Sequence, residues 1–580
     1  MTLLAPWPLK VVFDSVLGKH PIPDGIAALL RTLVGDASRT STGLLTTMVV
    51  AMIIIAIARA SFDFWGEMLT ASIGQKVIYE VRLQVFSHVQ RLSLSFHRRS
   101  RSGDLLGRLT SDIQAIQDVA SSGVNDLITS TLSILGILSI ATLIDWRFAM
   151  LILVVAPPIF LIAISFQMRI RRASRQFRAA EGSVGAVAQE NLNAIQVIQA
   201  SVSEDHEARK FTQLTRRSLG AGLAVSRLQA KVTPLVDLLG LIAVAAITWL
   251  GAREVLAGRL TPGYLLLFIT YFRSILSPMR QLSRLSTRFG KAEASAERIQ
   301  EILATDVEVR DLPRARPAPR LSGAVAFEHV TFGYTANRPV LRDLNIRVEP
   351  GMTVAVVGPT GSGKSTLLSL LPRFYDPLVG RVLIDGKDIR DFTVRSLREQ
   401  ISLVLQEPVL FTGTIRDNIA YGSPNASPDD IRNVARAAGI DDIVSRLSDG
   451  FDTDVGERGA TLSGGQRHSI TIARALLRDT PIVLLDEPVS GLDAESEALV
   501  MRGLHRLLHD RTTFLSTHRL STIEDADLIL VLGHGQLRES GTHEELVRAG
   551  GWYARWRAMQ LIGGNGLTDA AALSVALPAS

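Results

Sequence analysis

The stretch TVAVVGPTGSGKST, residues 353–366, decides the fold of half of this chain. Its first five residues form an apolar, β-branched run that is typical of a buried strand. The glycine-rich loop after them matches G-x-x-x-x-G-K-[S/T], and the helical run STLLSLL comes next. Glycines let the backbone N–H groups of such a loop surround phosphate groups. The stretch therefore predicts a nucleotide site between a strand and a helix.

Two polar side chains of this loop have distinct expected roles. The Lys364 ammonium reaches the outer phosphates, and the Ser365 hydroxyl coordinates Mg²⁺. The predicted nucleotide-binding residues of the loop are Gly358, Pro359, Thr360, Gly361, Ser362, Gly363, Lys364, Ser365 and Thr366.

A second apolar run, PIVLLDE, ends in two neighbouring carboxylates, Asp486 and Glu487. Asp486 is suited to hold the Mg²⁺ shell, and Glu487 is suited to polarise the attacking water. A carboxylate pair at a strand end can instead cap the helix that follows. The phosphate loop in the same domain favours the catalytic interpretation.

The segment LSGGQ, residues 462–466, precedes the helical run RHSITIARALL. Ser463, Gly464 and Gly465 at a helix N-terminus predict an anion site, although the same residues could merely cap the helix. A second anion site needs a second nucleotide, because the domain already has its phosphate loop. Here the sequence resembles the ABC ATPase family, whose LSGGQ signature, which includes Gln466, covers the ATP bound by the opposite subunit.

The resemblance extends to four further residues. It implies that Tyr334 stacks on adenine and that Gln406 senses Mg²⁺, the attacking water and the membrane domain. It also implies that Asp493 lies in a loop contacting the other subunit, and that His518 contacts the γ-phosphate. Taken alone, Tyr334 would be a core residue and His518 a structural one.

Near these motifs the sequence shows one further resemblance to the family and two departures from it. The segment 456–459 resembles a loop specific to exporters. Gly491 replaces the commoner alanine near Asp493, and His468 replaces the usual Gln or Arg after the signature. We expect the departure at His468 to be tolerated.

The N-terminal half contains long apolar runs. Each has about the length that crosses ~30 Å of hydrocarbon as a helix. Helices buried in a soluble core are the alternative, but five runs, two pairs of them joined by tight turns, favour a membrane domain. The runs are residues 44–64, 124–144, 148–166, 232–250 and 262–279, with a partial span at 1–17.

Charge sets the expected orientation of these spans. Residues 66–123 hold seven Lys and Arg and residues 167–231 hold eleven, against six in the other connections. The positive-inside rule therefore places both long loops in the cytosol. Both loops show helical apolar spacing, which fits either exposed coiled coil or levers that touch a cytosolic partner.

The membrane half resembles that of exporters with fused membrane and ATPase domains, the multidrug and lipid A exporter class. FHRRSRSGDLLGRLTSDI fits the first cytosolic coupling segment of that class, with Gly103, Arg108 and Asp112 in place. VIQASVSEDHEARKF fits the second segment, which in the family docks onto the ATPase domain of the partner.

The predicted fold is a helical transmembrane domain joined to an α/β phosphate-loop ATPase domain with a largely parallel sheet. Strand runs, among them VAFEHVTF at 325–332 and RVLIDG at 381–386, alternate with helical runs after a proline-rich linker. We expect the transmembrane domain over 1–305, the linker over 306–320, the nucleotide-binding domain over 321–561 and a tail over 562–580.

The N-terminus departs from the family, in which six spans are entered from the cytosol. Pro6, Pro8, Lys10 and Asp14 interrupt what should be an apolar first span. We expect a stub packed against residues 44–64, and hypothesise that Met1 is a truncated or misassigned start preceded by roughly 20–30 residues.

Composition supports the membrane assignment and excludes several chemistries. Apolar residues make up 47% of the 580 residues and the mean hydropathy is +0.23. Cysteine is absent, which excludes disulfides, thiolate catalysis and cysteine metal sites. The net charge of +6 could suggest DNA binding, but membrane proteins place Lys and Arg on the cytosolic side, so no nucleic-acid partner is expected.

The sequence thus predicts a half-transporter that binds ATP and Mg²⁺ and exports a lipid-like or amphiphilic substrate by alternating access. One phosphate loop and one signature per chain imply a dimer, either of identical chains or with a related chain. The expected location is the bacterial inner membrane, with the ATPase domain cytoplasmic. An ATP-gated channel or regulator and a non-transport ABC ATPase are the alternatives.

Charges within the predicted spans bear on the substrate. The notable ones are Arg59, Asp63, Asp237 and Arg273. Asp237 and Arg273 either line an inward cavity that accepts an amphiphile or form a pair between helices.

Overall fold

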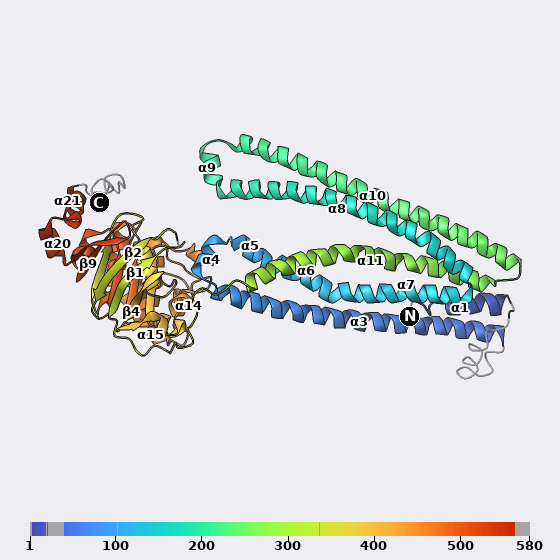
Figure 1. The fold of residues 1–580 in the computed structure, drawn as a ribbon, viewed down its shortest axis with the longest axis horizontal. Coiled ribbons are helices and arrows are strands. Elements are labelled where there is room, and N and C mark those ends of the chain that lie inside the picture. The colour runs from blue at the N-terminus through green and yellow to red at the C-terminus, as the bar shows by residue number, and fades with distance from the viewer. Residues whose placement is uncertain (1–2, 19, 21–39, 101, 336, 563–580) are drawn as a thin grey trace. The chain divides into compact units, whose positions relative to one another are not determined.

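The computed structural model describes residues 3–18, 20, 40–100, 102–335 and 337–562. The chain forms two compact units, shown in Figure 1. The helical unit contains residues 1–90 and 102–304, and the α/β unit contains residues 91–101 and 305–580. Each unit is described by itself below.

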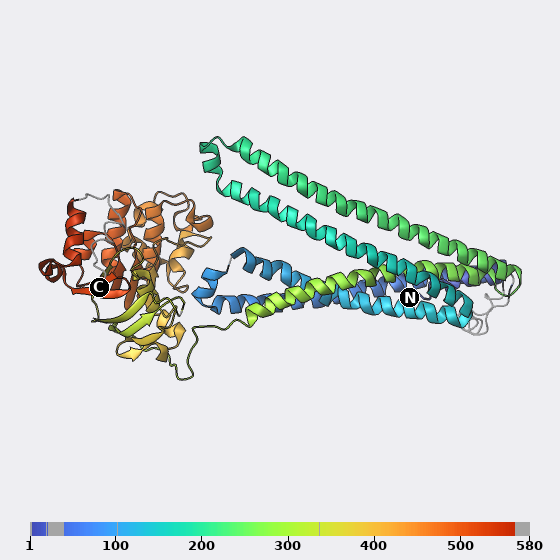
Figure 2. The ribbon, with the colours of Figure 1, turned by 45° about the horizontal axis from the view of Figure 1, so that its top comes forward.

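Long helices dominate the helical unit (Figures 1 and 2). At 1.5 Å per residue a 51-residue helix is about 76 Å long, more than twice the hydrocarbon thickness. Helices α8 and α10 lie side by side over most of their length. The long helices are α3 (Ser41–Arg91), α7 (Val124–Ile144), α8 (Trp146–Asn193), α10 (Glu204–Leu256) and α11 (Pro262–Leu303).

Short elements complete this unit. A chain of short helices precedes α7, and a short helix separates α8 from α10. They are α5 (Ser102–Gly107), η3 (Arg108–Asp112), α6 (Ile113–Asp118), η4 (Val119–Gly123) and α9 (Ile195–Ala200).

Within the described residues, three helices are long and apolar enough to cross a membrane: Ser41–Arg91, Gly103–Ile144 and Asp237–Leu256. They contain the predicted runs 44–64 and 124–144 and most of 232–250. The predicted runs 148–166 and 262–279 lie within α8 and α11. Most side chains of 148–166 lie outside the described residues.

A buried apolar cluster joins α7, α10 and α11. Ile137 of α7, Ile247 of α10 and the α11 residues Phe268 and Tyr271 are 0–1% exposed. Because successive turns of α11 supply Leu267, Phe268, Tyr271, Phe272 and Ile275, one face of this helix is buried against its neighbours. The opposite face of α11 is therefore not covered by α7 or α10.

The N-terminal stub consists of α1 (Trp7–Val11) and the π-helix η1 (Val12–Leu17). Val11 is buried against Leu44 and Met48 of α3, where the sequence predicted it to pack. The stub also contacts α11, because Trp7 Nε1 donates a hydrogen bond to the Tyr271 hydroxyl at 3.0 Å. The sequence did not predict this second contact.

Asp112 connects the predicted first coupling segment to α11. Its carboxylate accepts hydrogen bonds from Arg298, including Nε to Oδ2 at 2.8 Å, and from Ser295 at 2.9 Å. The hydrogen bonds from Arg298 lower the pKa of the Asp112 carboxyl below its usual value, although burial opposes them. This ion pair fixes η3 against the C-terminal part of α11.

The α/β unit contains a six-stranded sheet in the order β10-β9-β3-β8-β7-β6. Strands β9, β3, β8, β7 and β6 are parallel, and β10 pairs antiparallel at the edge. Its strands are β3 (Thr353–Val357), β6 (Ile401–Val404), β7 (Ile482–Asp486), β8 (Thr512–Ser516), β9 (Leu528–Gly533) and β10 (Gln536–Gly541). The predicted, largely parallel sheet is confirmed.

A second sheet in this unit is antiparallel, with the order β2-β1-β4-β5. The sequence predicted strands at 325–332 and 381–386 but did not separate them from the parallel set. The strands are β1 (Val325–Phe332), β2 (Leu341–Val348), β4 (Val379–Ile384) and β5 (Lys387–Asp388).

Helices cover the sheets, and three buried clusters form the interior of the unit. One cluster surrounds β1, β2 and the helix after β3, and a second lies among helices α14, α15, α17 and α18. The third joins β3 and β9 to helices α19, α20 and α21. The main helices are α12 (Lys364–Leu370), α14 (Ile415–Ala420), α15 (Pro428–Ala437), α17 (Gly464–Arg478), α18 (Ala494–Leu508), α19 (Leu520–Glu524), α20 (His543–Ala549) and α21 (Trp552–Ile562).

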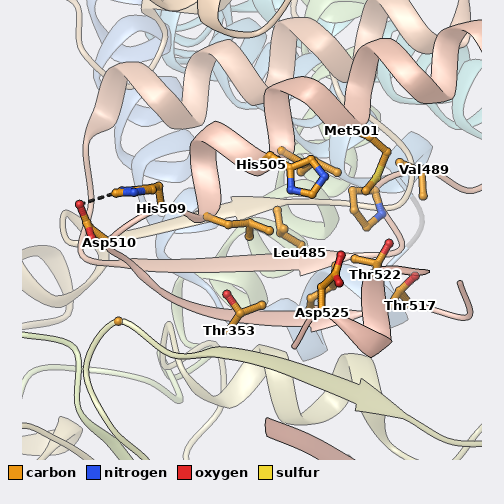
Figure 3. Close-up of a pocket in the computed structure, with 15 residues that line it drawn as sticks. Thr353, Leu485, Val489, Met501, His505, His509, Asp510, Thr517, Thr522 and Asp525 are labelled. Carbon is orange, nitrogen blue, oxygen red and sulfur yellow. Dashed lines mark ion pairs between the residues drawn. The ribbon is translucent and has the colours of Figure 1, made fainter. Parts of the chain in front are cut away.

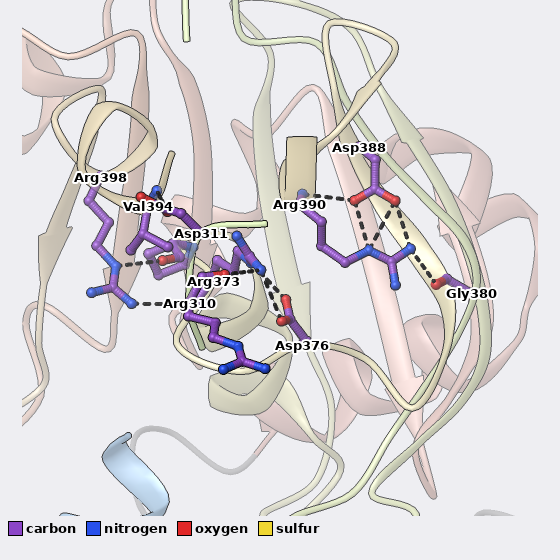
Figure 4. A network of polar contacts seen from close by, with 10 residues as sticks. Arg310, Asp311, Arg373, Asp376, Gly380, Asp388, Arg390, Val394 and Arg398 are labelled. Carbon is purple, nitrogen blue, oxygen red and sulfur yellow. Dashed lines mark hydrogen bonds and ion pairs between the residues drawn. The ribbon is translucent and has the colours of Figure 1, made fainter. Parts of the chain in front are cut away.

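The predicted linker is fixed to the α/β unit by polar contacts (Figure 4). Arg373, which is 1% exposed, forms an ion pair with Asp376 and donates a hydrogen bond to the Arg310 carbonyl at 3.1 Å. The Asp311 carboxylate accepts a hydrogen bond from the Val394 backbone N–H at 2.7 Å. The linker therefore packs against the residues that follow α12.

Candidate functional site

The phosphate loop connects β3 to α12, the position that the sequence predicted. Gly358 and Gly363 have φ values of +151° and +107°, which glycine adopts without a steric penalty. A Cβ atom at Gly358 would lie 2.2 Å from the Leu532 carbonyl oxygen, and one at Gly363 would lie 2.5 Å from Leu341 Cδ2. Both glycines are thus required by neighbouring atoms as well as by the loop conformation.

Lys364 and Ser362 of the loop are buried. Lys364 Nζ donates hydrogen bonds to the carbonyl oxygens of Gly358 at 2.9 Å and Pro359 at 3.2 Å. Burial lowers the pKa of the Lys364 ammonium, although Glu487 and Asp486 partly oppose this shift. The buried Ser362 hydroxyl has no hydrogen-bond partner among the described residues. A phosphate oxygen would satisfy it, so the loop fits the predicted ligand.

Glu487 stands directly after β7 in a constrained backbone conformation. Its φ is +47°, which is uncommon for a residue other than glycine and costs of order 1–3 kcal/mol. The Glu487 backbone N–H donates to the Ser516 carbonyl at 2.9 Å, and its carbonyl accepts from Ser490 N–H at 3.2 Å. These bonds hold the carboxylate at the end of the strand.

Gln406 and His518 both contact the Glu487 carboxylate. Gln406 Nε2 donates to Oε2 at 3.0 Å, and His518 Nε2 lies 3.2 Å from Oε1. The three predicted catalytic residues are therefore adjacent. Burial, and secondly the Lys364 charge, lower the pKa of the His518 imidazole, while Glu487 opposes the shift. The neutral ring can donate one hydrogen bond to an anionic oxygen.

Two of the predicted Mg²⁺ ligands lie where β7 ends and where α12 begins after the phosphate loop. Asp486 is the last residue of β7, and Ser365 lies in the first turn of α12. Among the described residues there is no cluster of three or more His, Asp and Glu side chains that could hold a metal alone. This fits Mg²⁺, which proteins commonly bind through one or two side chains together with nucleotide phosphates.

Tyr334 lies beside the phosphate loop. Its hydroxyl is 3.0 Å from the Thr366 Oγ1 atom, and its ring contacts Phe332 and Tyr375 edge to face. This arrangement brings the predicted adenine-stacking ring together with the last predicted residue of the loop.

Sequence reasoning missed a contact of the first coupling segment with Tyr334. Helix α4 (Leu94–Arg99) belongs to the α/β unit, and the Arg98 guanidinium lies 5.1 Å from the centre of the Tyr334 ring. Hydrogen bonding to Tyr375, and secondly to Tyr334, raises the pKa of Arg98. Arg99 Nη2 also donates to the Tyr334 carbonyl at 3.3 Å. In the sequence, only the basic run of this segment could have indicated a contact with Tyr334.

The signature segment begins α17. The Ser463 hydroxyl accepts a hydrogen bond from the Gln466 N–H, and the Gln466 side chain accepts one from the Ser463 N–H. A Cβ atom at Gly465 would lie 2.5 Å from Ser496 Cβ, so the close packing of α17 against α18 requires glycine. Helix capping and an exposed helix N-terminus therefore coexist in this segment.

His468, which departs from the family pattern, is a residue of the signature helix α17 and contacts the backbone of Gln406. It is 3% exposed, with Nδ1 3.0 Å from the Gly464 carbonyl oxygen and Nε2 3.2 Å from the Gln406 carbonyl oxygen. Both oxygens are acceptors, so a ring with a single N–H donates a hydrogen bond to one of them and only packs against the other. Nothing in the sequence alone indicated these contacts.

Asp493 is the N-cap of α18, and its side chain accepts a hydrogen bond from the Ser496 N–H at 2.9 Å. Hydrogen bonds from Ser496 lower the pKa of the Asp493 carboxyl. Within the chain the residue therefore has a capping role, and the predicted contact with a second subunit stays a prediction.

A cavity of about 430 Å³ lies between α18, α19 and the ends of β7 and β8 (Figure 3). Leu485 and Thr517 line it, and they directly precede Asp486 and His518 in the sequence. Since no residue of the phosphate loop lines it, this cavity is separate from the nucleotide site.

The fold and the site together define an ATPase fused to a membrane domain. Residues 6–279 match the family of the ABC transporter transmembrane region, and residues 341–490 match the ABC transporter family. The chain belongs to the ABC transporters, in the class of exporters that carry both domains on one polypeptide, and ATP hydrolysis is coupled to transport in this class.

Curated relatives and a solved structure match over most of the chain. YgaD of Bacillus subtilis (strain 168), whose name refers to multidrug export, is 35% identical over 94% of this chain and 96% of its own length. The ATP-dependent lipid A-core flippase of Syntrophus aciditrophicus (strain SB) is 35% identical over 88% of this chain and 85% of its own. A bacterial Atm1-family ABC exporter with ATP bound has a TM-score of 0.75 and 28% identity, covering 98% of this chain and 96% of the other.

Proposed function

We propose that this chain exports an amphiphilic, lipid-like substrate as a dimer in which two chains share two ATP sites. The observation that carries the proposal is that each chain has one phosphate loop and one capped signature helix, Ser463–Gln466. A helix N-terminus attracts anions, but the loop at 358–366 already binds the phosphates of its own nucleotide. The signature therefore serves the nucleotide of the second chain.

Three adjacent side chains, those of Glu487, Gln406 and His518, account for hydrolysis. The Glu487 carboxylate accepts a proton from the attacking water, and Gln406 orients that carboxylate through its 3.0 Å hydrogen bond. The neutral His518 imidazole donates to a γ-phosphate oxygen when ATP is present. Lys364 then exchanges its two carbonyl contacts for phosphate oxygens.

Mg²⁺ would be held by Ser365, Gln406 and Asp486 together with the phosphates. When bound, the ion neutralises charge that develops on the transferred phosphoryl group. Asp486 is partly buried at the end of β7, so its carboxylate is directed by the sheet rather than by a free loop.

The tip between α8 and α10 supports docking onto a second chain. Leu192, Ile195, Val197 and Val202 are 43–84% exposed there, although the predicted orientation places the tip in the cytosol. An exposed apolar patch in water indicates an interaction surface. We propose that it contacts the α/β unit of the partner, as the resemblance implies for residues 197–211.

Membrane location follows from the family, and the bacterial relatives support the inner membrane of a bacterium. The names of two relatives refer to multidrug export and to lipid A transfer, which supports an amphiphilic substrate here. ATP-dependent uptake into inside-out vesicles would distinguish an exporter from an ATP-gated channel, since only an exporter accumulates substrate against a gradient.

Mixed dimers test the shared sites. Lys364→Ala removes a phosphate contact, and Ser463→Arg blocks the signature. Each variant alone should lack turnover, whereas co-assembly should restore one intact site in every mixed dimer, built from the unchanged loop of one chain and the unchanged signature of the other. Activity that stays absent in purified mixed dimers would show that each chain completes its own site.

A further inference from the structure

Helix α11 is unlike the other described spans in the residues that it exposes. Over 262–279 the exposed residues are Pro262, Arg273 and Ser277. No large apolar side chain of this stretch is exposed. In contrast, α3 exposes Ile53 and Ile54 at 53% and 59%. The free face of α3 suits lipid, whereas the free face of α11 does not.

Arg273 lies deep in the predicted hydrocarbon region. It follows the helix cap Thr261 by twelve residues, which corresponds to about 18 Å along the axis of a span of ~30 Å. An arginine at this depth is costly unless it faces water, a partner or a ligand. Ser277 is one turn further along the same face, so the exposed face of α11 is polar at two successive turns.

The acidic residues of the predicted spans already have other cationic partners. Of the two alternatives for Asp237 and Arg273, the pair between helices is not formed, because Asp237 accepts from Arg280 at 3.0 Å. The remaining pairs are Asp14 with Lys10, Asp63 with Arg59 and Asp126 with Arg288. No acidic side chain of these described spans therefore neutralises Arg273.

We propose that Arg273 binds the anionic group of the transported amphiphile, with Ser277 beside it on the substrate pathway. This inference rests on the proposed export function and adds the charge of the substrate. A guanidinium suits a phosphate, sulfate or carboxylate, because its planar donors form paired charge-assisted hydrogen bonds. The apolar remainder of the ligand would contact the membrane helices.

The absence of cysteine permits a direct test of this face in the full chain in nanodiscs. Ser277→Cys would introduce one thiol, one turn from Arg273. Its rate of modification by an anionic methanethiosulfonate (sulfonatoethyl) is compared with that by a cationic one (trimethylammonioethyl). The arginine should favour the anionic reagent, and adding Arg273→Gln should reduce the ratio of the rates by about three- to tenfold. Arg273→Lys should preserve the ratio.

A matched control is Arg59→Gln in the same Ser277→Cys chain, which removes an exposed arginine from α3 and should leave the ratio unchanged. A thiol that neither water-soluble reagent modifies would place this face against lipid and overturn the proposal. A ratio that is insensitive to Arg273→Gln would overturn it equally.

Substrate selectivity gives the second readout. Dodecyl phosphate, dodecyltrimethylammonium and triethylene glycol monododecyl ether share one tail and differ in charge. ATP-dependent uptake and ATPase stimulation should favour dodecyl phosphate, and Arg273→Gln should raise its half-maximal concentration at least about tenfold. If Arg273→Gln kept the selectivity of the unchanged protein, the proposal would be overturned. Dissociation of the dimer of the Arg273→Gln variant would overturn it as well.

The two readouts separate this inference from the export function. A charge preference at Ser277→Cys without ATP-dependent uptake of any probe would refute export and leave the anion site supported. Uptake that prefers the cationic probe would retain export and refute the anion site.

Discussion

His468 Nε2 lies 3.2 Å from the Gln406 carbonyl oxygen, while Nδ1 of the same ring lies 3.0 Å from the Gly464 carbonyl oxygen. One buried imidazole thus connects the signature helix with the segment that holds Gln406. Gln406 in turn contacts Glu487 at 3.0 Å. A residue that departs from the family pattern is therefore part of the support for the proposed water-activating carboxylate.

His468→Ala should lower steady-state ATP turnover about tenfold with little change in ATP affinity. The change removes both contacts and leaves a void, so the Gln406 backbone loses its contact with the His468 ring, while the phosphate loop is untouched. Turnover and equilibrium ATP binding in nanodiscs measure the two effects.

His509→Ala is the matched control, since His509 is exposed and pairs with Asp510. It should behave like the unchanged protein. Equal turnover in His468→Ala and His509→Ala would show that the two imidazole contacts have no role in positioning Gln406.

Glu487→Gln should reduce turnover below about a tenth of the original while ATP binding persists, because the amide cannot accept the proton of the attacking water. The variant should accumulate a dimer with trapped ATP. Single-turnover hydrolysis and size-exclusion chromatography with ATP measure these outcomes. Glu495→Gln, an exposed change on α18, is the control, and retained turnover in Glu487→Gln would reject the general-base role.

Local patterns were enough to predict the parallel sheet and the phosphate loop. The run at 353–357 is apolar and β-branched, and its loop has a fixed glycine spacing, so both features depend on neighbouring residues. Glu487, Gln406 and His518 were predicted from separate motifs. Their meeting at one carboxylate depends on the order of β6, β7 and β8, which strand composition does not encode.

Features that depend on distant pairings were missed. The strand runs at 325–332 and 381–386 resemble those of the parallel sheet, and only their pairing with each other makes them antiparallel. The contact of Arg98 with Tyr334 joins residues 236 positions apart. Asp237 pairs with Arg280 rather than Arg273 because helix packing, not sequence spacing, selects the partner.

Asp112→Asn should destabilise the helical unit at pH 7 by about 1–3 kcal/mol, since it weakens the hydrogen bonds from Arg298 and Ser295. Arg298 lowers the pKa of the folded carboxyl, so the folded state binds fewer protons than the unfolded state. The stabilisation is complete above the unfolded value of about 3.9 and is lost as the pH falls through the folded pKa. Thermal unfolding should therefore show a difference between the two proteins that shrinks in strong acid. A difference that grows there would contradict the ion pair.

Tyr334→Ala should raise the Kd for ATP about tenfold or more, because it removes the ring proposed to stack on adenine. Tyr334→Phe should have a smaller effect, since it removes only the hydroxyl contact with Thr366. Fluorescent-ATP titration measures both. Tyr421→Ala is a matched control, as Tyr421 is an exposed ring stacked on Phe411. Unchanged affinity in Tyr334→Ala would remove this residue from the site.

Asp14→Ala tests whether the N-terminal stub stabilises the membrane domain. Asp14 accepts hydrogen bonds at 2.7 Å from both Thr261 Oγ1 and the Gly263 N–H, and it pairs with Lys10 at 3.5 Å. Lys10 and Asp14 are each 3% exposed. Removing the carboxylate leaves a buried ammonium without its partner and should cost about 3 kcal/mol, measured as a lower thermal midpoint.

The double variant Lys10→Met/Asp14→Ala separates charge from capping in this stub. It removes the buried ammonium as well, so it should recover part of the loss, and the remainder reports the two hydrogen bonds at the start of α11. Asp63→Ala is the control, because its pair with Arg59 is exposed and should contribute less than about 1 kcal/mol. If Asp14→Ala unfolded at the temperature of the unchanged protein, the stub would be a passive extension rather than a support for α11.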